Sequence, residues 1–230
     1  MTPIDFPSPN HEARPAGQAV DMLVLHYTGM PNGRAALGRL RDPEAKVSAH
    51  YLIDEDGSVY AMVPEDRRAW HAGVSYWRGR PDVNSRSIGI ELVNPGHAFG
   101  YRDFSSAQMG ALIALTHAIL SRHPIPARNV VGHSDVAPAR KIDPGERFDW
   151  RMLAEAGIGL WTKEWGDAGL VLSDRVEALR RWGYEVSENA DEAAALSAFQ
   201  RHFRPTRIDG FADEETAGLL ARLLEMADNS

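Results

Sequence analysis

Residues 23–26, Leu23-Val24-Leu25-His26, form an apolar run that ends in a histidine. A short apolar run of this kind is typical of a buried β-strand. Two more apolar runs end in a side chain that can bind a metal or move a proton. Residues 87–92 end in Glu91-Leu92, and residues 130–133 end in a second histidine, His133. The sequence therefore predicts three strands that each deliver a reactive side chain at one end.

Two further strands are predicted on either side of a turn. Residues 49–54 and 59–62 are largely apolar, and Asp56-Gly57 between them is a strong hairpin signal. A helix is predicted from Ser105, because Gln108 follows at the spacing of a capping box and apolar residues recur every three to four positions. A weaker helical pattern covers 34–41.

Strands and helices alternate along this part of the chain, so we expect an α/β fold in which helices flank a mixed β-sheet. The character changes after Trp150, and residues 157–168 look like a connection. Three helical patterns follow, at about 172–182, 192–202 and 213–226. We therefore predict a first domain over 1–156, which holds the strand-end histidines and Glu91, a linker over 157–168 and a small three-helix domain over 169–230.

The composition excludes several classes of function. The chain has 230 residues, a net charge of −7 and no basic stripe that could neutralise phosphates, so we expect no nucleic-acid partner. It has no cysteine, which excludes thiolate metal ligands and a cysteine nucleophile. No apolar run is long enough for a membrane span. No signal peptide is visible, so we expect a cytoplasmic protein, with the periplasm or cell envelope as the alternative.

The scattered histidines and carboxylates indicate a metal site. His26, His133 and Asp143 offer two imidazoles and one carboxylate, a set suited to Zn²⁺ with a fourth position left for water. A lone histidine is more often a hydrogen-bonded core residue than a ligand. On spacing alone, His50 and His71 remain competing candidates, as does Asp135.

Residues 21–150 resemble the type-2 N-acetylmuramoyl-L-alanine amidases, the group that includes AmpD and AmiD. Six stretches carry the resemblance and occur in the order found in that family. They are Leu25-His26-Tyr27-Thr28, Val47-Ser48-Ala49-His50-Tyr51-Leu52-Ile53, Arg68-Ala69-Trp70-His71-Ala72-Gly73, Ser87-Ile88-Gly89-Ile90-Glu91, Val131-Gly132-His133-Ser134-Asp135 and Arg140-Lys141-Ile142-Asp143-Pro144-Gly145.

The resemblance implies roles for particular residues. It places zinc on His26, His133 and Asp143, and it assigns Glu91 to the water that the metal activates. Lys141 could stabilise the oxyanion that forms as the amide carbonyl becomes tetrahedral.

The resemblance also narrows the remaining candidates. Asp135 would be a structural neighbour of the metal site, and His50 would lie near the pocket without binding metal. Tyr27, Trp70 and His71 are expected to line a groove for the sugar and peptide, although Trp70 alone could equally be a core residue.

The C-terminal segment is similar to small three-helix peptidoglycan-binding domains. The stretches that carry this likeness are residues 196–203, which contain Phe199-Gln200, and residues 208–216, which contain Asp209-Gly210 and Thr216. A helical cap or dimerisation module without glycan affinity is the alternative.

We therefore expect a zinc-dependent amidase that hydrolyses the bond between N-acetylmuramic acid, including its 1,6-anhydro form, and L-alanine. The expected substrate is peptidoglycan or a muropeptide, in cell-wall turnover or recycling. A non-catalytic peptidoglycan-recognition module is the main alternative, and a zinc endopeptidase is a third possibility. The sequence gives no indication of the oligomeric state.

Overall fold

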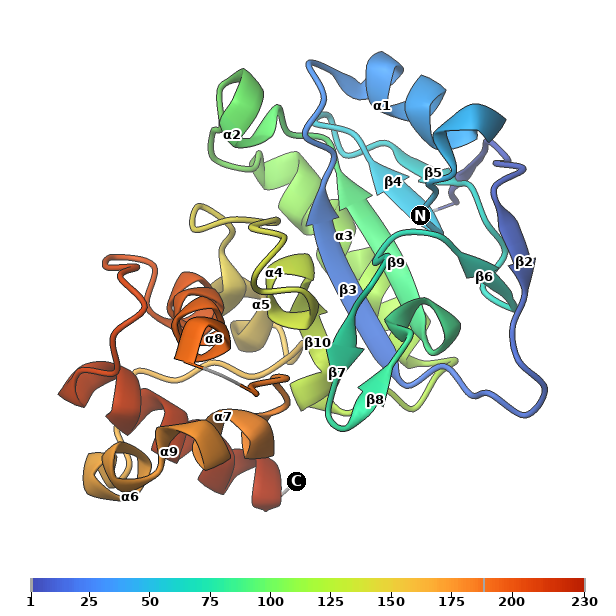
Figure 1. Ribbon diagram of the computed structural model, residues 1–230. Coiled ribbons are helices and arrows are strands. Elements are labelled where there is room, and N and C mark those ends of the chain that lie inside the picture. The colour runs from blue at the N-terminus through green and yellow to red at the C-terminus, as the bar shows by residue number, and fades with distance from the viewer. Residues whose placement is uncertain (1, 188, 230) are drawn as a thin grey trace.

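A six-stranded β-sheet forms the centre of the computed structural model, which describes residues 2–187 and 189–229 (Figure 1). Across the sheet, the strands are β1 (Ile4–Asp5), β5 (Val59–Ala61), β4 (Tyr51–Ile53), β9 (Ser87–Leu92), β3 (Met22–Tyr27) and β10 (Val130–Gly132). Neighbouring strands run parallel except for β4 and β5. The sheet is therefore mixed, and the expected α/β fold class is confirmed.

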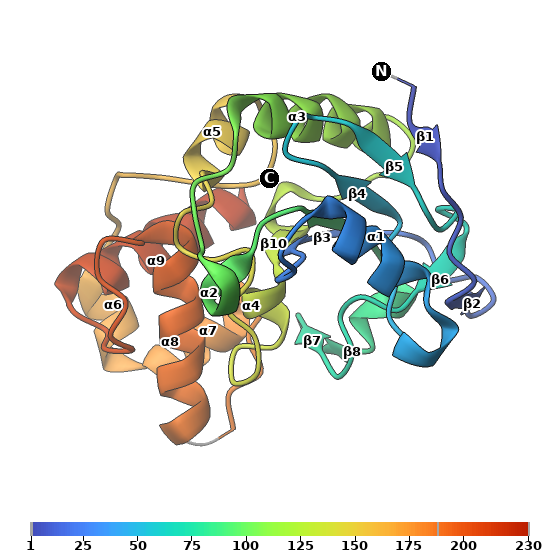
Figure 2. The same ribbon diagram turned by 90° about the horizontal axis from the view of Figure 1, so that it is seen from above.

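The two faces of the sheet are covered by different helices. Leu23 and Leu25 of β3 pack with α3 (Ser106–Leu120), whereas Met22 and Val24 belong to a second apolar cluster on the opposite face. Because side chains alternate along a strand, His26 shares the face of Met22 and Val24. Figure 2 shows α3 along one face and α1 (Gly33–Arg41) on the other.

Shorter elements connect these parts. Two small antiparallel sheets are formed by β2 (His11–Ala13) with β6 (Arg67–Ala69), and by β7 (Tyr76–Trp77) with β8 (Arg80–Pro81). The short helices are η1 (Pro43–Ala45), η2 (Val83–Ser85), α2 (Gly96–Phe99), η3 (Ala127–Asn129), α4 (His133–Val136) and α5 (Trp150–Glu155). The C-terminal helices are α6 (Ala168–Ser173), α7 (Arg175–Trp182), α8 (Asn189–Phe203) and α9 (Glu214–Asp228).

The predicted strands and the long helix are present, with two local differences. The strand predicted over 130–133 ends at Gly132, and His133 begins α4 because the Asp135 carboxylate accepts the Gly132 backbone N–H (2.8 Å). The capping box at α3 is only half formed. Ser105 accepts the Gln108 N–H, but the Gln108 side chain donates to backbone carbonyls of β4 and the segment after β9 instead.

Within the described residues, the C-terminal part contains one more helix than the three predicted. The pattern over 172–182 is interrupted at Asp174, which ends α6 and caps α7 by accepting the Glu177 N–H. The other two predicted helices correspond to α8 and α9. No helix in the described part of the chain is both long and apolar enough to cross a membrane.

Gln200, which follows Phe199 within α8, is hydrogen-bonded to the Asp209-Gly210 turn in the loop that leads to α9. Gln200 is fully buried, and its side-chain oxygen accepts the backbone N–H groups of Asp209 and Gly210, at 2.9 Å each. Its side-chain nitrogen donates to the Phe211 carbonyl (2.8 Å). Gly210 has φ +71°, and a Cβ there would lie 2.9 Å from the Ala193 carbonyl oxygen. These residues therefore hold the loop in shape.

The C-terminal helices pack directly on the sheet-bearing part. Trp77 and Tyr184 meet edge to face with ring centroids 5.4 Å apart, within an apolar cluster that both parts share. The carboxylate of Asp135 in α4 accepts hydrogen bonds from the Tyr184 hydroxyl and from His202 Nδ1, at 2.8 Å each. The division at 157–168 stays a prediction, but the two parts are joined by a common core.

This contact predicts a stability effect. Tyr184→Phe keeps the ring but leaves a buried carboxylate oxygen without its donor, so unfolding should become easier by about 1.5–3 kcal/mol, as for other hydrogen bonds to charged groups. Urea denaturation measures the change. Tyr76→Phe is the matched control, because the Tyr76 hydroxyl has no hydrogen bond within the described residues. Equal stability of the two variants would refute the assigned contact.

Candidate active site

Strand pairing brings the predicted reactive residues to one edge of the sheet. In the register of β3 and β9, His26 lies directly opposite Glu91. In the register of β3 and β10, Leu25 lies opposite Gly132, so His133 follows immediately beside His26. The carboxyl ends of parallel strands meet at the same edge, which is where α/β sheets usually present a ligand site.

His26, His133 and Asp143 form a group that could hold a metal ion. The Nδ1 atoms of the two histidines are 2.9 Å apart, and each lies 3.0 Å from Oδ2 of Asp143. Tetrahedral Zn²⁺, with bonds of about 2.0–2.2 Å, holds its ligand atoms roughly 3.3–3.6 Å apart. The triangle therefore needs to open only slightly around such an ion, and its donor set fits zinc.

The electrostatics of this group also suit a cation. Burial, followed by the neighbouring His133, lowers the pKa of His26 to about 4, so its imidazole is neutral near pH 7. Burial alone would raise the pKa of Asp143, but His133 and His26 together hold that pKa well below its usual range. The group thus presents a carboxylate and a neutral imidazole, which are the protonation states that metal binding requires.

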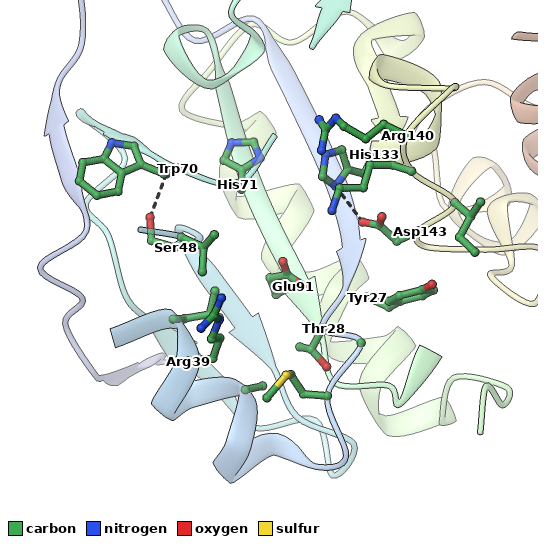
Figure 3. A pocket seen from close by; sticks show the side chains of 17 residues that line it. Tyr27, Thr28, Arg39, Ser48, Trp70, His71, Glu91, His133, Arg140 and Asp143 are labelled. Carbon is green, nitrogen blue, oxygen red and sulfur yellow. Dashed lines mark hydrogen bonds and ion pairs between the residues drawn. The ribbon is translucent and has the colours of Figure 1, made fainter. Parts of the chain in front are cut away.

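A cavity of about 380 Å³ opens beside this group. Seven of the eight residues predicted for the site line it, namely Tyr27, Trp70, His71, Glu91, His133, Lys141 and Asp143. Figure 3 shows Glu91 between Trp70 at one end of the cavity and Tyr27 with Asp143 at the other. His26 is almost fully buried, at 1% exposure.

Glu91 has the surroundings of a proton acceptor. Its Oε2 atom is buried and has no hydrogen-bond partner within the described part of the chain. Burial, together with the nearby Asp143 carboxylate, raises the pKa of Glu91 well above its usual value, while the Lys141 ammonium opposes this shift. A carboxylate with a raised pKa and a free oxygen beside a candidate metal centre can take a proton from water.

The three residues predicted to contact substrate differ in how far their polar atoms are already hydrogen-bonded within the protein. The Tyr27 hydroxyl lies 3.0 Å from His97 Nδ1 at the rim, and burial raises the pKa of Tyr27. Trp70 lines the cavity and donates its backbone N–H to Ser48 Oγ (2.9 Å). Both ring nitrogens of His71 are engaged inside the protein, by His26 Nε2 and Ser87 Oγ at 3.0 Å each. His71 therefore has no free ring nitrogen for a substrate.

Asp135 and His50, which competed as metal ligands on spacing alone, are hydrogen-bonded to other parts of the protein instead. Asp135 is bonded to the C-terminal part and is not one of the three clustered ligands. His50 is fully buried, and its Nδ1 accepts the Gly89 backbone N–H (2.9 Å), while its Nε2 lies 3.0 Å from the Arg67 carbonyl oxygen. Its ring is 5.8 Å from the His71 ring, behind the site.

Other residues of the cavity were not predicted. Ser48 and Arg140 lie within stretches that carry the family resemblance, which was the available signal for both. Arg140 donates to the backbone carbonyls of Ala72 and Val74, at 2.7 Å each. Arg39 reaches the cavity from α1, and nothing in a single exposed arginine of an amphipathic helix indicates this.

Comparison with known proteins gives the family. Residues 16–146, more than half of the chain, match the family described as N-acetylmuramoyl-L-alanine amidase (Amidase_2). The chain is 38% identical over 243 residues to the N-acetylmuramoyl-L-alanine amidase AmiD of Escherichia coli K12, covering 93% of this chain and 86% of that protein.

Solved structures agree over nearly the whole chain. E. coli AmiD in complex with the substrate anhydro-N-acetylmuramic acid-L-Ala-D-gamma-Glu-L-Lys matches with a TM-score of 0.80 and 37% identity, covering 92% of this chain and 91% of that one. AmpDh3 of Pseudomonas aeruginosa matches with a TM-score of 0.82 and 37% identity, covering 99% and 100%. The chain therefore belongs to the type-2 N-acetylmuramoyl-L-alanine amidases, a family of hydrolytic enzymes.

Proposed function

We propose that this enzyme is a zinc-dependent amidase that hydrolyses the bond between the lactyl group of N-acetylmuramic acid and L-alanine. The observation that carries the proposal is the triangle of His26, His133 and Asp143 beside the free oxygen of Glu91. A binding-only module would have no use for a buried carboxylate with an unpartnered oxygen at a candidate metal centre.

The substrate form is proposed from the relatives and the cavity. E. coli AmiD was solved with an anhydro-muramyl tripeptide, and AmpDh3 with an anhydromuramic pentapeptide. A cavity of about 380 Å³ is in the range of pockets that enclose small ligands. We infer that the enzyme accepts muropeptides, including the 1,6-anhydro form, with Tyr27 and Trp70 contacting substrate at opposite ends. Its cytoplasmic location stays a prediction that cell fractionation can test.

The residues divide the chemistry between them. His26, His133 and Asp143 would hold the zinc, which when bound supplies Lewis acidity to polarise the amide and activate water. Glu91 accepts the proton of the attacking water at its free Oε2 and can return it to the leaving amine. Lys141, on the cavity wall, places a positive charge where the carbonyl oxygen becomes an oxyanion.

Metal content tests the ligand assignment. The purified protein should contain about one zinc per chain, and His26→Ala or Asp143→Ala should lose most of it because each removes one of three protein ligands. Elemental analysis after dialysis measures the zinc. His117→Ala is the control, since His117 is exposed on α3 and remote from the group. Full zinc content in both ligand variants would overturn the assignment.

Rates test the two catalytic roles. Glu91→Gln should slow cleavage about 10²–10⁴-fold and Lys141→Ala about 10²–10³-fold, with zinc content and KM little changed, because both residues act on charge that develops in the transition state. Single-turnover release of the alanine-headed peptide, identified by mass spectrometry, measures the rate. Glu44→Gln and Lys163→Ala, both exposed, are the matched controls.

Two outcomes would contradict these roles. Wild-type rates in Glu91→Gln and Lys141→Ala would remove both residues from the mechanism. Release of a fragment cut within the stem peptide, with the muramyl–alanine bond intact, would instead identify a zinc endopeptidase.

We also propose that the C-terminal helices bind peptidoglycan. Support comes from the likeness of residues 196–216 to peptidoglycan-binding domains and from two exposed aromatic side chains, Trp165 (54%) and Phe211 (71%), which offer flat apolar surfaces to a sugar. Gln200 and Asp209 bond to each other and shape the loop between α8 and α9, so we assign sugar contact to the exposed aromatic side chains and not to this pair.

Co-sedimentation with intact sacculi tests this role. The double variant Trp165→Ala/Phe211→Ala should pellet with sacculi several-fold less than wild type, because it removes both proposed sugar contacts while leaving the active site in place. Ile4→Ala is the control, an exposed apolar residue on the edge strand β1. If the double variant pellets as well as wild type, these aromatic residues do not bind the wall.

A further inference from the structure

Two consecutive residues meet the outer nitrogen of both histidine ligands. His26 and His133 each turn Nδ1 toward the metal triangle and Nε2 away from it. His26 Nε2 lies 3.0 Å from Nδ1 of His71, and His133 Nε2 lies 3.1 Å from the carbonyl oxygen of Ala72. The segment His71-Ala72 therefore contacts the back of both ligands.

The tautomer of His133 follows from its partner. A carbonyl oxygen only accepts hydrogen bonds, so His133 must carry its proton on Nε2 to bond with Ala72. A neutral imidazole has one N–H, and its other nitrogen is a lone pair. Nδ1 of His133 is therefore free to bind a metal.

The tautomer of His26 follows from a series of hydrogen bonds that runs through His71 and Ser87 to the Val83 carbonyl. The Ser87 hydroxyl has a single hydrogen, which it donates to the Val83 carbonyl oxygen (2.7 Å). Ser87 Oγ must then accept from Nε2 of His71 (3.0 Å). A neutral His71 is left with an acceptor at Nδ1, which takes the proton of His26 Nε2. Nδ1 of His26 is likewise a lone pair facing the metal triangle.

The surrounding backbone is arranged to hold this segment. The side-chain oxygen of Asn84 accepts the backbone N–H groups of both His71 (3.1 Å) and Ala72 (2.8 Å). Gly89 leaves room for the imidazole, since a Cβ there would lie 2.4 Å from Cγ of His71. Gly89 shares one face of β9 with Ser87 and Glu91. Along this face, Ser87 bonds to His71, Gly89 leaves room for its ring, and Glu91 reaches the cavity.

We propose that His71-Ala72, directed by Ser87 and held by Asn84, fixes both histidine ligands in the Nε2–H tautomer that metal binding needs. His71 is then a positioning residue that acts through His26, and its ring is not a substrate contact. The inference rests on the proposed metal-dependent function. Partners of this outer kind commonly set ligand orientation, and their loss typically costs about 10–100-fold in metal affinity or activity.

A pair of substitutions at one position tests the inference. His71→Leu removes the acceptor for His26, so zinc affinity should fall about 10–100-fold. His71→Asn places a side-chain oxygen near the position of Nδ1, so it should restore the affinity to within a few-fold of wild type. Competition against a chromophoric chelator measures the affinity, and circular dichroism confirms that both variants fold.

A second measurement does not depend on metal or activity. In metal-free protein with ¹⁵N-labelled histidine, two-bond correlations should report a proton on Nε2 of His26, with the signal assigned by its loss in His26→Ala. Ser87→Ala, which removes one hydroxyl, should mix the tautomers of His71.

The outcomes separate this inference from the proposed function. Wild-type zinc affinity in His71→Leu, or equal loss in His71→Leu and His71→Asn, would overturn the positioning role while leaving zinc binding intact. A proton on Nδ1 of His26 would overturn it as well. Failure of the wild-type protein to bind zinc would instead contradict the proposed function.

Discussion

The parallel pairing of β3 with β9 and β10 is the constraint on which the site depends. It sets His26 opposite Glu91 and brings His133 to the neighbouring strand end, although these residues are far apart in sequence. Because the side-chain period of a strand is two, a one-residue slip would turn each of these groups to the opposite face. The apolar residues of β3 and β9 are fully buried. Burial of each large apolar side chain stabilises the fold by about 1.5–3 kcal/mol, so the core strongly specifies this register.

The same alternation explains why the site has depth. On β9, Ile88 and Ile90 pack into the core under α3. On the other face of the strand, Ser87 bonds to His71 and Glu91 lines the cavity. The metal-binding triangle is therefore backed by hydrogen-bonded protein on one side and open to the cavity on the other. Burial keeps His26 neutral and raises the pKa of Glu91, so one environment prepares both a ligand and a base.

The sequence predicted the main strands, α3 and the clustering of the three ligands, because long apolar runs and ordered motifs carry strong local signals. It placed His133 at the end of a strand instead of the start of α4, since a helix of only four residues, capped locally by Asp135, is too short to show a helical period. The internal bonds of His71 could not be predicted from the sequence, because Ser87 lies 16 residues away and the direction of its hydroxyl depends on the Val83 carbonyl. Arg39 was missed because an exposed helix residue shows no sign of the groove it faces.

The buried Gln200 has a consequence for how related chains are recognised. Its side-chain oxygen bonds only to the Asp209-Gly210 turn inside the protein. The missing side chain of Gly210 likewise serves an internal purpose, since it lets the turn approach α8. A search keyed on the Phe-Gln and Asp-Gly pairs would therefore detect a helix–loop–helix architecture. It would score a chain that has lost every sugar contact as highly as one that has kept them, so affinity for the wall must be judged from the exposed residues of these helices and loops.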